Sequence, residues 1–469
     1  MTVPVPADVL SRLKAVLGEG GWCQDPERLA PKLLEWRDRW TGATPLMVLP
    51  ATTADVAAVV GICAEAGVAI TPQGGNTGLV GGQIPQGEIL LSTERLRAIR
   101  AVDAYDDVLV AEAGATLAAV HQAAAEVNRR FPIGLASEGS ATVGGIISTN
   151  AGGTQVLRYG TTRNLVLGIE AVLPNGEVWN GLKRLRKDNT GYDLKQLLIG
   201  AEGTLGVVTA ASLKLFPALS SRAVAIAGVA SPRAAIELLA RAKDLAGGAV
   251  EAFELMGRLG VDFVLKNIPG ARDPLSGVHP WYVLAEFASG EPGAAEAAME
   301  RFLSEGLEAG LIADAVVAQS QTQAKALWNV RENQSPAQKP EGATWKHDIS
   351  VPVSRVADFL DQATAAMARF APGARIAAFG HVGDGNIHYD VLVATGGDDA
   401  AHSARRDEGS RIVHDIVAAL EGSISAEHGL GSMKTAEAEH YKDPVELAAL
   451  RAVRQALDPK RIMNPRVLF

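Results

Sequence analysis

The chain has very little cysteine, with only Cys23 and Cys63 among 469 residues. Two cysteines cannot form a disulfide framework, which excludes a disulfide-stapled secreted scaffold and indicates a reducing compartment. No uncharged apolar run approaches the roughly 18 residues that a membrane-spanning helix needs. The first residues also lack the basic and apolar stretches of a signal peptide. We therefore expect no membrane span and a cytoplasmic location.

An excess of positive charge is also absent. The 44 Lys and Arg residues face 53 Asp and Glu residues, for a net charge of −9. This balance argues against nucleic acid as the main partner, although it still allows a local basic pocket for a small anion. The chain is too long for one hydrophobic core, so two or three domains are expected.

The patterning predicts an α+β fold that changes character near residue 217. Residues 1–45 form a helical segment, and residues 46–216 alternate short strands with helices, one of them running from an N-cap at Thr53 to Ala66. Residues 217–420 alternate Ala/Leu-rich helices with apolar strands typical of antiparallel pairing, and residues 421–469 form a C-terminal segment. Within these segments we expect strands at 68–72, 88–92, 108–112, 166–173, 205–215, 281–287, 316–318, 345–351, 374–379 and 387–393, and helices at 117–127, 233–246, 293–308, 354–369 and 403–420. The turn signal at 174–176 should pair the strand at 166–173 with the segment that follows it.

Three glycine-rich tracts stand out, at residues 72–82, 139–153 and 200–206. Glycine lets the main chain approach a ligand closely, and successive free N–H groups form an anion nest suited to a pyrophosphate. Any one tract is equally compatible with simple tight turns, but three with interleaved Thr, Asn and Ser favour a nucleotide site. Neither a Rossmann fingerprint nor a Walker loop is present.

Histidines cluster in two glycine-bounded motifs of the second half, His381–His388 and Ser425–Gly429. Alternate residues of an extended segment share a face, so Asn386, His388 and Asp390 should point the same way. The turn Gly383–Gly385 can reverse the chain and bring His381 beside His388. With Glu427, these imidazoles make a three-ligand set for zinc or a similar divalent ion, with a position open for a substrate. The alternative is a set of hydrogen-bonded interior histidines. His428 is a candidate general base, provided that the backbone turns so that it and Glu427 reach one pocket.

The motifs together resemble a known family. Pro72–Gly78, Asn150–Gly153 with Arg158–Gly160, Lys187–Asp193 and Gly200–Gly206 are similar to the FAD-binding domain of the p-cresol methylhydroxylase and vanillyl-alcohol oxidase superfamily. The second half resembles the branch of D-2-hydroxyglutarate, D-lactate and glycolate dehydrogenases, the first most strongly. The resemblance implies a two-subdomain FAD-binding domain at 46–216, a substrate domain at 217–420 and a C-terminal segment that returns to the flavin.

The resemblance also implies which residues hold the cofactor. No histidine lies in or near the first glycine tract, so the FAD is expected to be non-covalent. The FAD contacts implied by the family fall on Pro72, Gly74, Gly75, Asn76, Thr77, Gly78, Gly82, Gly139, Ser140, Thr142, Gly145, Asn150, Gly152, Gly153, Tyr159, Gly160, Glu202, Gly203, Gly206, Val208 and Asn464.

The family further places a divalent ion, expected to be Zn²⁺, on His381, His388 and Glu427. Substrate contacts fall on Arg331, Ser335, Lys346, Asp390 and His428. The planar fork of Arg331 suits a carboxylate. Taken without the resemblance, Arg331 and Lys346 are more simply explained as surface charges, and the resemblance reverses that preference. Ser335 stands where Thr is expected, and Asp390 where Asn is expected. Asp390 adds a negative charge beside an anionic substrate.

The resulting hypothesis is an FAD-dependent, metal-assisted dehydrogenase that oxidises D-2-hydroxyglutarate by hydride transfer to flavin N5, with His428 as the base. D-lactate or glycolate oxidation is the alternative within the family. A metallohydrolase and a non-catalytic metabolite-binding protein are alternatives of other classes. We expect a soluble electron acceptor, such as an electron-transfer flavoprotein, and take a homodimer as the default assembly.

Overall fold

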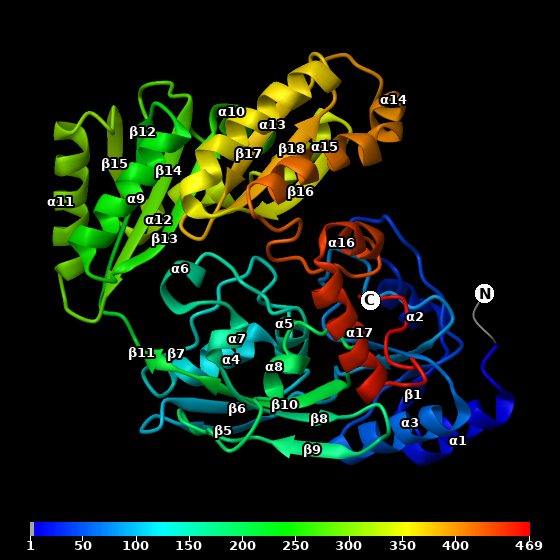
Figure 1. Cartoon of the computed structure of the whole chain (residues 1–469). Coiled ribbons are helices and arrows are strands. Elements are labelled where there is room, and N and C mark those ends of the chain that lie inside the picture. Colours follow the sequence, from blue (N-terminus) through cyan, green and yellow to red (C-terminus); the bar gives the residue numbers. More distant parts are fainter. Residues whose placement is uncertain (1–3) are drawn as a thin grey trace. The chain divides into compact units, whose positions relative to one another are not determined.

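The structure is a computed structural model that describes residues 4–469 (Figure 1). The chain divides into two compact units. The first unit contains residues 1–153, 160–218 and 427–469, and the second contains residues 154–159 and 219–426. The N-terminal segment 1–45 and the C-terminal helices therefore both belong to the first unit.

The first unit contains a small sheet in the order β1-β2-β4-β3, in which β2 and β3 run parallel to β4. Its strands are β1 (Trp22–Cys23), β2 (Met47–Val48), β3 (Ile70–Gln73) and β4 (Ile89–Ser92), and its helices include α1 (Ala7–Leu17), α2 (Pro26–Leu33) and α3 (Thr53–Ala66). The prediction of Thr53 as the N-cap of α3 is wrong by one residue. The side chain of Thr52 caps the helix in a capping box with Asp55, and the hydroxyl of Thr53 donates to Glu170 instead.

A second sheet in the first unit is antiparallel, in the order β5-β6-β10-β8-β9. Its central strand is bonded on both sides and is buried almost throughout. The predicted hairpin across Gly176 is confirmed by the pairing of the strands on either side of it. The strands are β5 (Ile99–Asp103), β6 (Val108–Glu112), β8 (Val166–Val172), β9 (Val178–Gly181) and β10 (Val207–Lys214); a separate pair joins β7 (Arg129–Arg130) to β11 (Phe216–Pro217).

Short helices and the C-terminal tail complete the first unit. The tail returns to the small sheet, where the N–H of Asn464 donates to the carbonyl of Ile70 at 2.8 Å. Arg454 is buried and holds the end of the chain by donating to the carbonyls of Met463 and Val467. The helices are α4 (Leu117–Ala125), α5 (Val143–Ser148), α7 (Thr162–Leu165), α8 (Lys195–Leu198), α16 (Thr435–Tyr441) and α17 (Pro444–Leu457).

The second unit is built on a seven-stranded sheet in the order β15-β12-β14-β13-β17-β18-β16, and each neighbouring pair is antiparallel (Figure 1). The α+β prediction is thereby confirmed. Strands 221–229 and 250–257 were not predicted. The seven strands are β12 (Ser221–Val229), β13 (Val250–Gly257), β14 (Trp281–Ser289), β15 (Asp314–Val317), β16 (Thr344–Ser350), β17 (Arg375–Gly380) and β18 (Asn386–Leu392).

Helices cover both faces of this sheet (Figure 1). One face carries α9 (Pro232–Ala246), α11 (Ala294–Glu308), α13 (Val356–Phe370) and α15 (Arg406–Ala419). The opposite face carries α10 (Arg258–Asn267) and α12 (Gln321–Glu332), which pack on an apolar cluster that includes Met256, Tyr282 and Phe379. The remaining elements are α6 (Val156–Tyr159), α14 (Asp399–Ala404) and the 3₁₀ turns η1 (Pro336–Glu341) and η2 (Val353–Arg355).

Strand β16 separates core residues from polar residues by simple alternation. Trp345 and His347 lie toward α15, where the indole ring lies against Gly409 and the imidazole contacts Ser410. Lys346 and Asp348 therefore point to the opposite face of the sheet. This second face is where the polar residues of the candidate site gather. Among residues 4–469, no helix is both long and apolar enough to cross a membrane.

Candidate active site

The first two glycine tracts lie against each other in the first unit. A Cβ atom on Gly74 would come within 2.2 Å of Thr142 Oγ1, and one on Gly75 within 1.8 Å of the carbonyl oxygen of Ser140. Only glycine allows this approach. The third tract joins them, because a Cβ on Gly203 would lie 3.1 Å from Pro72 Cγ. Three tracts far apart in the sequence thus form one glycine-lined region.

The C-terminal tail is bonded to the same region. Asn464 Nδ2 donates to the carbonyls of Gly82 at 2.9 Å and Glu202 at 2.8 Å. The Glu202 carboxyl group accepts from the N–H groups of Leu430 at 2.9 Å and Gly431 at 2.8 Å. Burial raises the pKa of Glu202 to about 7, although these backbone hydrogen bonds act to lower it. Glu202 therefore ties the third tract to the loop that follows His428.

Two polar atoms support a ligand in this region. Thr142 Oγ1 and Asn464 Oδ1 are buried, and neither has a hydrogen-bond partner among the described residues. The Thr142 side chain does not cap the helix that it precedes. Buried polar atoms are ordinarily paired. The Thr142 hydroxyl is a neutral donor beside close-packed glycines, which suits a nucleotide pyrophosphate, and the amide oxygen of Asn464 can accept from an N–H group of a ligand. The residues present therefore fit FAD.

The other predicted FAD residues occupy varied positions. Asn76 already uses its side-chain N–H groups on the carbonyls of Pro31 and Leu34. Asn150 adopts a φ of 49° and accepts from the N–H of Arg163 through Oδ1. Val208 is buried in β10. Tyr159 ends α6, which clusters with the second unit. The rest lie in the three tracts or at the start of the loop after α6, namely Thr77, Gly78, Gly139, Gly145, Gly152, Gly153, Gly160 and Gly206.

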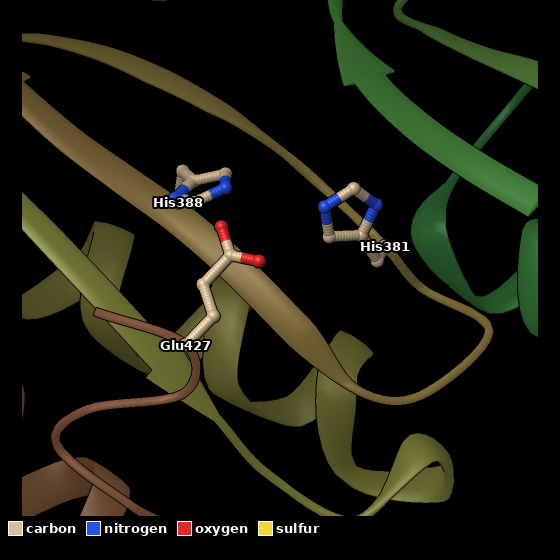
Figure 2. A group of neighbouring side chains, drawn as sticks. All are labelled: His381, His388 and Glu427. Carbon is tan, nitrogen blue, oxygen red and sulfur yellow. The ribbon is translucent and has the colours of Figure 1, made fainter. Parts of the chain in front are cut away.

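The candidate metal ligands meet at the end of β17 and the start of β18. The turn Gly383–Gly385 reverses the chain as predicted, with Gly385 at a φ of 84°. It places the ring centroids of His381 and His388 6.1 Å apart. Ligand atoms of His381, His388 and Glu427 all lie within 4.8 Å of one another. Figure 2 shows the Glu427 carboxylate directed toward the space between the two rings.

The backbone before Glu427 is fixed to β16. Ser423 bridges to Ser350, and the N–H of Ala426 donates to the carbonyl of Asp348 at 3.2 Å. The chain then bends through residues 426–428, and Gly429 adopts a φ of 76°. The backbone bend that the sequence required at Glu427 and His428 is therefore present. Ligand atoms of Asp348, Glu427 and His428 also lie within 4.8 Å of one another.

A buried carboxylate that the sequence did not reveal supports this group. Glu254, in β13, is fully buried; its Oε1 lies 2.7 Å from Nδ1 of His381, and its Oε2 accepts from Nε of Arg331 at 2.7 Å. Burial alone would raise the pKa of Glu254, but the charges of His381 and Arg331 lower it below its usual value. Because Nδ1 of His381 contacts Glu254, an ion would be bound through Nε2, the usual arrangement of a metal-bound imidazole.

Asp348 and Asn386 form a second support beside His388. Asn386 Nδ2 donates to Asp348 Oδ1 at 2.9 Å, and the same oxygen lies 3.9 Å from Nδ1 of His388. The expected shared face of Asn386, His388 and Asp390 agrees with the register, in which Asp348 is opposite His388 and Lys346 is opposite Asp390. Asp348 could have been found in the sequence, since it lies two residues after Lys346 in a predicted strand.

The predicted substrate residues lie on the same face of the sheet. Arg331, near the end of α12, places its guanidinium 5.0 Å from the ring centroid of Phe379. Lys346 Nζ donates to Ser335 Oγ at 2.8 Å and to Gln338 Oε1 at 3.3 Å, and it lies 3.5 Å from Asp390 Oδ2. Gln338 was missed because nothing in the sequence of η1 distinguishes it from a surface residue.

The donor set limits the chemistry of the site. Two imidazoles and one carboxylate suit a zinc-type ion with an open coordination position. His428 Nε2 lies 3.9 Å from Glu427 Oε1, close enough for a base to serve a group bound at that position. Arg331 and Lys346 add positive charge, so the arrangement is suited to deprotonating a small anionic alcohol.

Comparisons with known proteins place the chain in a family. Residues 44–181 match the FAD binding domain, and residues 218–468 match the C-terminal domain of FAD linked oxidases. The chain therefore belongs to the FAD-linked oxidases, a class of flavin-dependent oxidoreductases, and the predicted resemblance is confirmed.

Its curated relatives include enzymes of one narrower group within this class. The chain is 37% identical over 457 residues to the mitochondrial D-2-hydroxyglutarate dehydrogenase of Arabidopsis thaliana, covering 97% of this chain and 80% of the relative. It is 36% identical over 436 residues to the D-2-hydroxyglutarate dehydrogenase of Xanthomonas citri pv. viticola, covering 93% and 91%. A solved structure of p-cresol methylhydroxylase with substrate bound shares the fold, with a TM-score of 0.72, 16% identity and coverage of 99% and 98%.

Proposed function

We propose that this protein oxidises D-2-hydroxyglutarate to 2-oxoglutarate, using non-covalent FAD and a divalent metal ion. The observation that carries the proposal is the joint network of His381, Glu254 and Arg331. In it one buried carboxylate holds both a candidate metal ligand and a candidate carboxylate-binding guanidinium, at 2.7 Å each. A site that must hold the hydroxyl and a carboxylate of one substrate needs such a fixed relation between the two.

Separate residues would bind the ion, bind the substrate and accept the proton. When bound, the flavin supplies the acceptor for a hydride, and the metal ion supplies positive charge at the hydroxyl oxygen. His381, His388 and Glu427 would hold the ion. Arg331 would bind a substrate carboxylate. His428 would take the hydroxyl proton on its imidazole.

D-lactate oxidation is the second candidate within the family. It is favoured by the ion pair between Lys346 and Asp390, because a paired lysine is a weaker anchor for a second carboxylate. The electron acceptor is proposed to be a soluble carrier such as an electron-transfer flavoprotein.

Anaerobic spectroscopy tests the proposal directly. Mixing the oxidised holoenzyme with D-2-hydroxyglutarate without oxygen should bleach the flavin absorption, and dialysis against a chelator should slow the bleaching without removing the flavin. L-2-hydroxyglutarate is the matched control substrate. A protein that shows no flavin bands, or whose flavin is not reduced by D-2-hydroxyglutarate, would refute the proposal.

A further inference from the structure

The ammonium group of Lys346 is fully engaged by the protein. An ammonium has three N–H donors, and three side-chain oxygens surround Nζ, from Ser335 at 2.8 Å, Gln338 at 3.3 Å and Asp390 at 3.5 Å. The Asp390 side chain is 4% exposed and that of Lys346 is 27% exposed. The charge of Lys346 therefore has a buried counter-ion before any substrate arrives.

Arg331 differs from Lys346 in how many of its donor groups the protein uses. Its Nε donates to Glu254, but the described residues show no hydrogen bond from its two Nη groups. A guanidinium held at Nε keeps its outer edge for a bidentate carboxylate. The site thus offers one cation, Arg331, with donors to spare and one cation, Lys346, that two hydrogen bonds and an ion pair already hold.

The candidate metal ligands and the Lys346–Asp390 pair are spaced along the same strands. Asp348 is opposite His388 and Lys346 is opposite Asp390, two residues further along β16 and β18. Two residues of strand span about 7 Å. The Lys346–Asp390 pair therefore lies about the length of a short dicarboxylic acid from the candidate metal ligands, where a distal carboxylate would reach.

We propose that Asp390 is a specificity-determining residue. By pairing with Lys346, it weakens the hold of the site on the far carboxylate of a dicarboxylic 2-hydroxy acid. Monocarboxylic 2-hydroxy acids, which have no far carboxylate, are unaffected. The inference rests on the proposed function and concerns the ratio of the two substrate classes, since Asp390 repels the second negative charge and occupies its lysine partner.

The test compares kcat/KM for D-2-hydroxyglutarate and D-lactate in the holoenzyme and its variants. Asp390→Asn should raise the ratio of the dicarboxylate to the monocarboxylate about tenfold, mainly through KM, because one unit charge is removed beside the substrate. Asp390→Ser provides a second neutral variant should the amide disturb folding. Asp361→Asn, an exposed carboxylate on α13, controls for the loss of one negative charge.

A double-mutant cycle tests whether Asp390 acts on substrate preference through Lys346. In a Lys346→Met background, Asp390→Asn should change the ratio by much less than tenfold, because the lysine that it releases is gone. An unchanged or lowered ratio in Asp390→Asn would overturn the inference and leave the proposed function standing. If neither D-2-hydroxyglutarate nor D-lactate reduces the flavin of the wild-type enzyme, the proposed function itself is refuted.

Discussion

His381 and Glu254 are joined by a 2.7 Å hydrogen bond between Nδ1 and Oε1, although they lie 127 residues apart in the sequence. The bond fixes the imidazole so that Nε2 faces Glu427 and His388 (Figure 2). Carboxylates in this position orient metal-bound histidines and raise their basicity. Glu254 should therefore determine how tightly the site holds its ion.

Glu254→Gln should weaken metal affinity about 10–100-fold, the usual effect of losing an outer carboxylate partner. Competition with a chromogenic chelator measures this change. Glu286→Gln is a matched control, because Glu286 is a buried carboxylate of the same sheet that pairs instead with Arg222 and Trp328. Equal metal affinities in wild type and Glu254→Gln would contradict the assigned role.

His428→Ala should lower kcat by about 10²–10⁴-fold, because the hydroxyl proton loses its acceptor. The flavin content, read from the absorption spectrum of the purified protein, should not change. His440→Ala serves as the control, since His440 is an exposed histidine on the nearby helix α16. A His428→Ala enzyme with normal turnover would rule out the proton-acceptor role.

Removal of the metal should abolish most of the turnover and should be reversible. Dialysis against a chelator should yield a protein that keeps its flavin, and adding back Zn²⁺ should restore the rate. Replacing His388 by Ala should make this restoration fail at the same concentration of Zn²⁺. Metal content measured by mass spectrometry, together with initial rates, tests the outcome; full activity at zero metal content would contradict it.

Glu341 should make the second unit sensitive to acid. Hydrogen bonds from Asn267 and Lys266, with a further one from Arg375, lower the pKa of Glu341 from 4.5 to about 2. A carboxylate with a depressed folded-state pKa contributes stability that is complete above its unfolded pKa. That contribution is lost as the pH falls from about 4.5 toward 2.

The corresponding variant is Glu341→Gln, measured by thermal unfolding as a function of pH. At pH 7 it should lower the Tm by about 2–4 °C, the shift that a loss of roughly 1 kcal/mol produces in a domain of this size. The difference from wild type should shrink as the pH falls from about 4.5 toward 2, because Glu341 is then protonated in the unfolded chain and, near pH 2, in the folded protein as well. A difference that does not depend on pH would show that the ion pairs of Glu341 are not its source.

Local patterns in the sequence predicted much of the site. The glycines of the turn at Gly383–Gly385 indicated that His381 and His388 would be neighbours, and the alternation of β18 placed His388 and Asp390 on one face. Glu254 could not be found in this way. It lies in a largely apolar strand, and only the sheet order, which brings β13 beside β17, gives it His381 as a partner.

The fold, like the site, was predictable where a pattern is local but not where it depends on distant strands. Helix α3 was predicted because its apolar pattern and threonine cap are local, and only the choice between Thr52 and Thr53 was wrong. The pairing of Thr53 with Glu170 depends on a strand more than a hundred residues away. Likewise, the opposition of Lys346 and Asp390 follows from strand register, which no pattern within either segment specifies.

Consecutive residues of strand β16 point alternately into the hydrophobic interior and toward the candidate site. Inserting or deleting a single residue before Lys346 would turn Trp345 and His347 outward and drive the lysine and Asp348 into the apolar layer under α15. Change in this segment is therefore confined to replacing side chains at constant length. New substrate preferences can arise there through exchanges such as one at Asp390, whereas changes in length cannot be tolerated.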